Sequence, residues 1–267
     1  MESPLQTGGA PEHYFAVGHE EQLFRAAWSQ QLPLLLKGPT GVGKTRLVEH
    51  MAQQLGRPLI TVPCHEDLTA SDLVGRYLLK GGETVWMDGP LTTAVKQGAI
   101  CYLDEIVEAR SDTVVVLHPL IDHRRALHID RLGETLIAPK EFMVVMSYNP
   151  GYQTLLKDLK ASTRQRMVAI HLNFPSPEVE TRILTDLYSV PLELAQRLVK
   201  LGNAIRRLDT PGLSEVASTR ALISAALLTR DQQMSARDAA IAAIAVALSD
   251  DQEVTAGLTE LIGTYLS

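Results

Sequence analysis

A glycine-rich segment carries the residue types that bind phosphate, and it reads Gly38-Pro39-Thr40-Gly41-Val42-Gly43-Lys44-Thr45. Glycines let successive backbone N–H groups turn toward an anion, and a helix that begins there adds favourable partial charge. Lys44 is expected to reach the β- and γ-phosphates of a nucleotide, and the Thr45 hydroxyl is expected to ligate Mg²⁺. The segment therefore predicts a P-loop. Because no N-K-x-D run that would read guanine is present, ATP is favoured over GTP.

Two carboxylates, Asp104 and Glu105, directly follow the apolar run at 99–103. Asp104 is expected to hold Mg²⁺ through water, and Glu105 is expected to polarise a water molecule for attack on the γ-phosphate. A kinase that passes the phosphoryl group to a substrate gains nothing from such a water-activating residue. The pair therefore favours ATP hydrolysis, and a merely solvated Asp-Glu pair at a strand end is the alternative.

Three further polar positions match this chemistry. Asn149 follows the apolar run at 142–148 and could hydrogen-bond the γ-phosphate or the attacking water; an Asx turn before Pro150 is the alternative. Arg164 and Arg166 lie before the last apolar run, where either could reach the nucleotide of a neighbouring subunit, or simply be solvated. Arg220 begins a predicted helix and could fold over the phosphates.

The elements that must position these residues are predicted from periodicity. Apolar runs with little polar alternation predict buried parallel strands at 34–37, 59–63, 99–104, 142–148 and 168–172. Amphipathic stretches predict helices between them, notably at 44–55 and 111–121. This alternation is typical of an α/β fold with a parallel five-stranded sheet between helical layers.

Two insertions and a second domain complete the predicted organisation. Residues 76–87 and 126–137 each place glycine between β-prone arms, which predicts two hairpins, with irregular loops as the alternative. Prolines at 175 and 177 end the strand pattern, and five helices are then predicted, with Ser218 and Ser235 as N-caps. These helices lie at 178–188, 192–207, 218–229, 236–248 and 252–266. The prediction is therefore an α/β domain at 1–172 and a small all-helical lid domain at 173–267.

Composition limits the partners. The chain has 267 residues and a formal net charge of −6, which argues against a dedicated nucleic-acid-binding module. Its longest apolar run, 239–248, is too short to span a bilayer, and residues 1–11 lack the pattern of a secretory signal. Two cysteines do not make a disulfide framework. A cytoplasmic protein with no membrane partner is expected.

The five motifs in this order, with a helical lid, resemble the AAA+ ATPases. Residues 38–45 match Walker A, Asp104 and Glu105 end a Walker B strand, and Asn149 matches sensor 1. Arg166, with Arg164 as its rival, matches the arginine finger, and Arg220 matches sensor 2. The two hairpins resemble those of the MoxR group. The segments at 37–46, 64–77, 147–153 and 156–166 resemble the CbbQ/NorQ subgroup, and CbbQ most of all, within a match covering roughly residues 14–220.

The resemblance implies a function and partners. CbbQ-type proteins are homo-hexameric ATPases that act with a CbbO adaptor to free inhibited Rubisco of tightly bound sugar phosphates, and NorQ-type proteins serve the assembly of nitric oxide reductase. Within such a ring, Tyr77, Leu78 and Trp86 of the first hairpin could face the pore and contact a client protein; packing within the hairpin is the alternative. A small-molecule P-loop kinase and a GTPase-type switch are the remaining alternatives for the chain.

Two other clusters carry chemistry-bearing residues. His118, His123 and His128 lie close together in the sequence, but their spacing of five does not place them on one helix face, so contact with a partner or a solvated surface is favoured over a metal site. Cys64 and His65 are adjacent on an extended segment and so point to opposite faces, which argues against a nucleophile–base pair.

Overall fold

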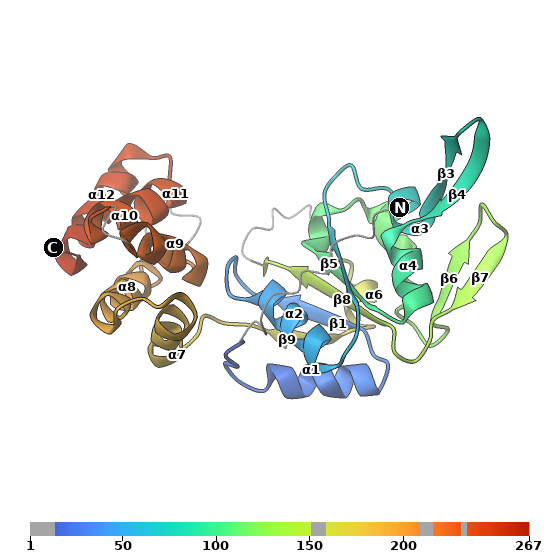
Figure 1. Cartoon of the computed structure of the whole chain (residues 1–267), viewed down its shortest axis with the longest axis horizontal. Coiled ribbons are helices and arrows are strands. Elements are labelled where there is room, and N and C mark those ends of the chain that lie inside the picture. Colours follow the sequence, from blue (N-terminus) through green and yellow to red (C-terminus); the bar gives the residue numbers. More distant parts are fainter. Residues whose placement is uncertain (1–13, 151–158, 209–215, 231–233, 267) are drawn as a thin grey trace. The chain divides into compact units, whose positions relative to one another are not determined.

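The structure is a computed structural model that describes residues 14–150, 159–208, 216–230 and 234–266. The chain divides into two compact units. The first comprises Met1–Gly38 and Gly43–His171, and the second comprises Pro39–Val42 and Leu172–Ser267. Figure 1 shows the strands in the first unit and the helices that follow β9 in the second.

Five parallel strands form the central sheet of the first unit, in the order β2-β5-β8-β1-β9. This confirms the predicted parallel five-stranded sheet. The central strands β1 and β8 are almost entirely buried, which explains why their residues are mostly apolar, as expected of a parallel sheet covered on both faces. The strands are β1 (Leu34–Lys37), β2 (Leu59–Pro63), β5 (Ile100–Asp104), β8 (Met143–Tyr148) and β9 (Val168–His171).

Six α-helices of the first unit accompany this sheet among the described residues. α1 packs against α2 and β9, whereas α4 packs against β2 and β5. The helix predicted at 111–121 is wrong in length, since it ends at Val115 and turns follow. Pro119 explains this, because proline disfavours helical geometry at the residue before it and cannot donate a helical hydrogen bond. The helices are α1 (Glu20–Ser29), α2 (Lys44–Gln54), α3 (Ala70–Val74), α4 (Pro90–Gln97), α5 (Ser111–Val115) and α6 (Ala161–Arg164).

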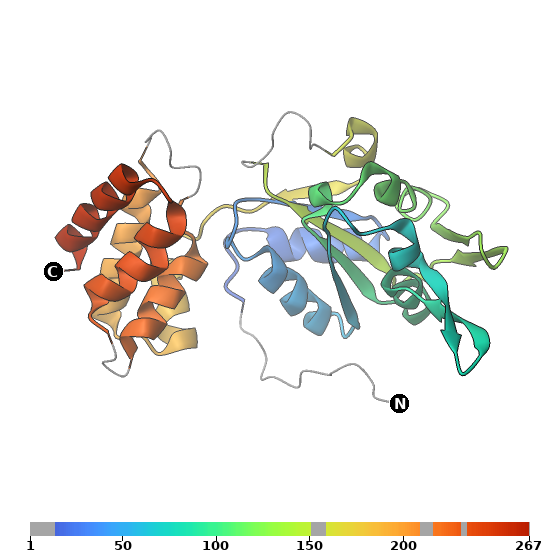
Figure 2. The same cartoon turned by 90° about the horizontal axis from the view of Figure 1, so that it is seen from above.

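Two antiparallel hairpins stand at the positions predicted for them. The first pairs β3 (Gly75–Lys80) with β4 (Glu83–Asp88), and the second pairs β6 (Ala126–Ile129) with β7 (Glu134–Ile137). Gly81 and Gly82 connect β3 to β4 with φ of 61° and 86°, the left-handed conformations that a tight hairpin turn requires. Both hairpins lie on the same side of the first unit in Figures 1 and 2.

The second unit is helical after β9. Two predicted helices, 178–188 and 236–248, are each interrupted by a π-helical turn, at Ile183–Leu187 and Ile241–Ala245. Ser218 and Ser235 accept N-cap hydrogen bonds from the backbone, as predicted. The α-helices are α7 (Pro177–Arg182), α8 (Leu192–Ile205), α9 (Thr219–Thr229), α10 (Ala236–Ala240), α11 (Val246–Leu248) and α12 (Gln252–Tyr265). Among the residues that the structure describes, no helix combines the length and apolar character needed to cross a membrane.

Candidate functional site

The sheet order brings three predicted motifs to one edge. β8 lies between β5 and β1, and all three strands run parallel, with Leu103 opposite Met146 and Lys37 opposite Tyr148. The residues that follow these strands therefore leave the same, carboxyl edge of the sheet, where open α/β sheets bind their ligands. They are Gly38, Glu105 and Asn149, and Asp104 is the last residue of β5 at the same edge.

The P-loop has the backbone conformation that its glycines allow. Gly41 and Gly43 have φ of 72° and 102°, in the left-handed region that glycine adopts without strain. α2 begins at Lys44 with Gly43 as N-cap and no capping side chain, so an anion can take the place of the cap. The Lys44 side chain is buried and its Nζ donates to the carbonyl oxygen of Gly38 at 2.8 Å.

A hydroxyl network holds the Asp104 carboxylate. Oδ1 of Asp104 accepts from Ser147 Oγ at 2.5 Å and from the Tyr102 hydroxyl at 2.6 Å. The Tyr102 hydroxyl also lies 3.4 Å from Oγ1 of Thr45. Burial, together with the hydrogen bond to Asp104, raises the pKa of Tyr102 above its ordinary value, so the phenol stays protonated near neutral pH and keeps donating. The two predicted Mg²⁺ ligands, Thr45 and Asp104, are thus joined through a single phenol.

Tyr102 and Ser147 hold the candidate site residues Thr45, Asp104 and Glu105, and sequence reasoning missed them. Tyr102 stands inside the apolar run of β5, and both residues are fully buried. The available signal was the hydroxyl itself, because a buried polar group needs a hydrogen-bond partner. The Thr45 hydroxyl and Asp104 carboxylate fit Mg²⁺, which prefers oxygen ligands and is usually bound through one or two carboxylates, substrate phosphates and retained waters.

Glu105 is held in a strained conformation next to this network. Its φ of 55° and ψ of 49° are left-handed, which is unusual for a residue with a side chain. The backbone N–H of Glu105 donates to Ser147 Oγ at 3.1 Å, and its side chain is exposed. Such strain costs of order 1–3 kcal/mol and gathers at functional sites. Because the Glu105 side chain is exposed, a water molecule can reach its carboxylate.

The predicted arginines and Asn149 occupy different places. Asn149 directly follows β8 and is half-buried. Arg164 ends α6 and is half-buried, whereas Arg166 is exposed and its Nη1 donates to the carbonyl oxygen of Ser162 at 2.5 Å. Arg220, in the first turn of α9 in the second unit, is exposed.

Arg166 lies at the amino end of the parallel strands, whereas the P-loop lies at their carboxyl end. It precedes β9, whose first residue, Val168, stands opposite Leu34, the first residue of β1. The P-loop begins after the last residue of β1, and a four-residue strand spans roughly 13 Å. The arginine is therefore separated from the P-loop of its own chain by the length of a strand.

The first hairpin exposes apolar side chains, but its predicted client contacts differ in exposure. Tyr77 is 43% exposed and Leu78 is 37% exposed, whereas Trp86 is half-buried. Trp86 packs edge-on against Tyr77, with ring centroids 5.2 Å apart, and donates to Asp88 at 2.8 Å. Trp86 therefore supports the hairpin from inside. The most exposed apolar residue of the hairpin is Leu79, at 78%, which sequence reasoning did not single out.

The histidine group and the Cys64–His65 pair show no sign of metal or nucleophile chemistry among the described residues. His118 lies 3.0 Å from the hydroxyl of Thr163, and His128 lies 3.0 Å from that of Thr135. In the described ranges of the chain, no three or more His, Cys, Asp or Glu side chains form a group that could hold a metal ion. Burial raises the pKa of the Cys64 thiol to about 12, with a smaller contribution from Asp104 and Glu105, so it is poorly suited to act as a nucleophile.

Comparisons with known proteins agree with this geometry. Residues 33–167 match the family model "AAA domain (dynein-related subfamily)" and residues 180–265 match "CbbQ/NirQ/NorQ C-terminal". The fold is also that of the RuvB Holliday junction branch migration motor of Thermotoga maritima, with a TM-score of 0.54 at 17% identity over 91% of this chain and 67% of that one.

Three curated relatives are similarly close. Protein NorQ of Paracoccus denitrificans is 56% identical, over 93% of this chain and 92% of its own. The denitrification regulatory protein NirQ of Stutzerimonas stutzeri is 54% identical over 96% and 94%, and protein CbbQ of Hydrogenophilus thermoluteolus is 54% identical over 81% of each chain.

The parallel sheet, the P-loop and the acidic end of β5 define an AAA ATPase. Within that class, the chain belongs to the CbbQ/NirQ/NorQ family, of the MoxR type.

Proposed function

We propose that this protein hydrolyses ATP with Mg²⁺ at the carboxyl edge of its sheet and uses the energy to remodel a protein client. The observation that carries the proposal is the network that joins Thr45, Asp104 and the strained Glu105 through Tyr102 and Ser147. These groups stand beside the P-loop on neighbouring strands. A kinase, which passes the phosphoryl group to a substrate, has no need for a water-activating carboxylate held in this way.

Each residue has a distinct part in the proposed reaction. The backbone N–H groups of the P-loop surround the phosphates, and Lys44 neutralises their charge. Thr45 and Asp104 would hold Mg²⁺, directly and through water, and the ion would supply charge neutralisation to the phosphates. Glu105 orients the attacking water and accepts its proton, and Asn149 is placed to hold that water or the γ-phosphate. Arg220 would couple the helical unit to the phosphates.

The position of Arg166 supports a ring of identical subunits. Because the arginine stands a strand length away from its own P-loop, we propose that it contacts the nucleotide of the neighbouring subunit, with Arg164 as the rival. Each active site is then shared between two subunits. A closed homo-hexamer satisfies every such contact.

We expect Arg166→Ala to lose ATP hydrolysis while its own subunit still binds ATP, because the neighbour loses charge stabilisation of its transition state. The decisive measurement mixes inactive Arg166→Ala subunits with inactive Lys44→Ala subunits. Mixed rings contain interfaces that join an intact P-loop to an intact Arg166, so part of the activity should return.

Arg164→Ala is the matched control for this experiment. If Arg164→Ala rather than Arg166→Ala is complemented by Lys44→Ala, the role belongs to Arg164. No recovery in verified mixed rings, or full activity of Arg166→Ala by itself, would contradict the shared site.

Two clients are proposed for the motor. The CbbQ-like segments favour inhibited Rubisco as the client, engaged through a CbbO-like adaptor. Such a client suits a motor, because a tightly held sugar phosphate leaves slowly and distortion of the closed site would speed its release. The close match to NorQ and NirQ over more than nine tenths of this chain supports nitric oxide reductase assembly as the second candidate. In either case, the exposed apolar hairpin β3–β4 is the proposed client contact.

Reconstitution separates the clients. With inhibited Rubisco, ATP and a CbbO-type adaptor, we expect carboxylation to recover over time. Tyr77→Ala and Leu79→Ala should weaken the recovery by several-fold and leave basal ATP hydrolysis near the wild-type rate, because the hairpin lies outside the nucleotide site.

Leu192→Ala is the matched control, since Leu192 is an exposed apolar residue of α8 in the other unit. If the adaptor complex forms and hydrolyses ATP without restoring Rubisco, the Rubisco proposal is wrong, and activation of nitric oxide reductase in the parallel assay would favour the second client. An equal loss of hydrolysis and recovery in Tyr77→Ala would assign the residue to folding.

A further inference from the structure

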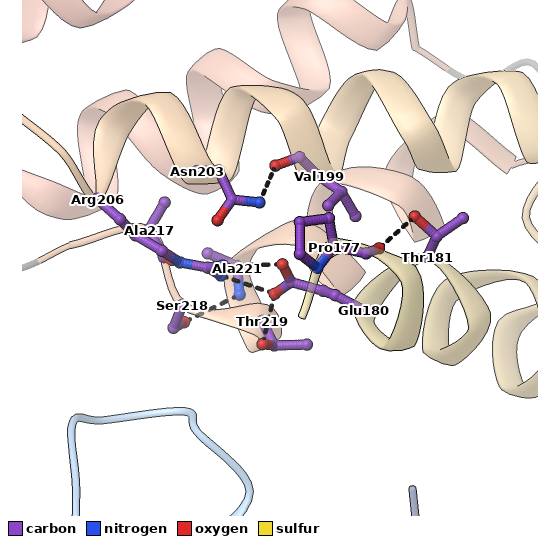
Figure 3. A network of polar contacts seen from close by, with 10 residues as sticks. All are labelled: Pro177, Glu180, Thr181, Val199, Asn203, Arg206, Ala217, Ser218, Thr219 and Ala221. Atoms are coloured by element: carbon purple, nitrogen blue, oxygen red, sulfur yellow. Dashed lines mark hydrogen bonds and ion pairs between the residues drawn. The ribbon is translucent and has the colours of Figure 1, made fainter. Parts of the chain in front are cut away.

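The second unit contains a buried ion pair between Glu180 of α7 and Arg206, the C-cap residue of α8. Their side chains are 0% and 8% exposed. Nη1 of Arg206 donates to Oε2 of Glu180 at 2.8 Å, and Nη2 donates to Oε1 at 2.7 Å, so the contact is bidentate (Figure 3). The Arg206 guanidinium also stacks on the ring of Phe174, 4.0 Å from its centroid.

The pair extends to the entry of α9. Nε of Arg206 donates to the carbonyl oxygen of Ala217 at 2.7 Å, and the hydroxyl of Thr219 donates to Oε1 of Glu180 at 2.6 Å. Ser218, between these two residues, accepts from the backbone N–H of Ala221 at 3.1 Å. Three consecutive residues are thus held by directional bonds, two of them to the buried pair, as Figure 3 shows.

Packing alone does not explain this arrangement. Taking two charges out of water is costly, and well-packed apolar residues of similar volume often stabilise a fold as well or better. The helical unit already has an apolar core that includes Leu184, Leu198, Leu201, Ile205, Leu222, Ile244 and Ile262. What a carboxylate and a guanidinium add is direction, because they bind the Ala217 carbonyl and the Thr219 hydroxyl at defined positions.

The residue that follows these three is Arg220. Thr219 is buried against the pair, whereas Arg220 is exposed, so fixing the rotation of Thr219 about the helix axis also fixes the direction in which Arg220 leaves the helix. We propose that Glu180, Arg206 and Thr219 are positioning residues for Arg220, setting the first turn of α9 so that this guanidinium can act on bound nucleotide. The proposal rests on the function proposed above for Arg220.

The test is a double-mutant cycle on ATP turnover by the full-length protein. Thr219→Val keeps the shape of the side chain and removes only its hydrogen bond to Glu180. We expect turnover to fall about two- to tenfold, the effect typical of one hydrogen bond. In an Arg220→Ala background, the same change should cause no further loss, since no guanidinium remains to be positioned.

Two matched variants distinguish positioning from folding. Thr219→Ser retains the hydroxyl and should restore most of the turnover, whereas Thr229→Val removes a threonine hydroxyl at the far end of α9 and should leave turnover unchanged. The thermal unfolding midpoints of the four single variants and of the double variant are measured in parallel, so that a loss of folded protein is recognised.

Several results would overturn the proposal. They are an equal further loss from Thr219→Val in the Arg220→Ala background, wild-type turnover of Thr219→Val, and no rescue by serine. Wild-type turnover of Arg220→Ala would do the same, because Arg220 would then need no positioning. The Lys44→Ala variant tests the proposed ATPase site separately from the positioning of Arg220. If Lys44→Ala hydrolyses ATP at the wild-type rate, the ATPase site is wrong; if it does not, the ATPase site stands and only the positioning proposal fails.

Discussion

Glu105→Gln is expected to bind ATP and retain it, with hydrolysis slowed by roughly 10²–10⁴-fold, the usual cost of losing a general base. Glutamine keeps the size of the side chain but cannot accept the proton of the attacking water. The backbone should be unaffected, because the left-handed conformation of Glu105 is stabilised by its own N–H, which donates to Ser147.

Two measurements on this variant are needed together: the affinity for ATP by calorimetry and the rate of phosphate release. Glu141→Gln, an exposed carboxylate elsewhere in the first unit, is the matched control and should hydrolyse ATP at the wild-type rate. Near-normal hydrolysis by Glu105→Gln would mean that another residue is the base. Loss of ATP binding would mean that Glu105 has a structural part in the site.

Lys44→Ala is expected to lose ATP binding. A hydrogen bond to a charged group contributes about 1.5–3 kcal/mol, and Lys44 is expected to make more than one with the phosphates, so the affinity should fall by at least about 100-fold. The fold should survive, because the Nζ of Lys44 bonds to the Gly38 carbonyl within the loop itself and the apolar core of the sheet does not depend on this charge.

Calorimetry with ATP and Mg²⁺ measures this effect, and circular dichroism checks the fold. Lys96→Ala is the control, since Lys96 pairs with Asp88 on the first unit, at the base of hairpin β3–β4, and should bind ATP normally. If Lys44→Ala binds ATP with unchanged affinity, the assignment of residues 38–45 to the nucleotide site is wrong.

The local elements of the first unit could be predicted because their signals are local. β1 and β2 occur at the predicted residues, and β5, β8 and β9 differ from the predicted runs by one residue at one end. Strands buried on both faces need continuous apolar residues, and such runs stand out in a sequence. The helices α1, α3, α4 and α6 were not predicted. α3 has only five residues, and its start depends on a capping box between Thr69 and Asp72, a contact more visible in coordinates than in periodicity.

The interruptions of the helices could not be predicted in the same way. The π-helical turns at Ile183–Leu187 and Ile241–Ala245 lie within runs whose apolar periodicity continues on both sides. One extra residue per turn changes which side chains face the core, so the choice depends on what each turn packs against. That information belongs to the neighbouring helices.

The sequence by itself determined the chemistry of this protein. The P-loop residues, Asp104, Glu105 and Asn149 could be predicted as site residues because backbone freedom at glycine, the charge of Lys, Asp and Glu, and the hydrogen-bonding capacity of Asn are properties of the residues themselves. The strand or helix that carries each motif could be predicted from patterns only a few residues long. These features point to an ATPase without reference to any distant contact.

Only the tertiary structure decided how these residues support one another. Thr45 and Tyr102 are 57 positions apart, and their hydroxyl groups meet because α2 packs against β5. Asp104 and Ser147 are 43 positions apart, and they meet because β5 and β8 are neighbours. Glu180, Arg206 and Thr219 likewise meet from three helices to hold the residue before Arg220. Strand order and helix packing create such contacts through the burial of apolar surface over the whole unit, and no spacing along the chain encodes them locally.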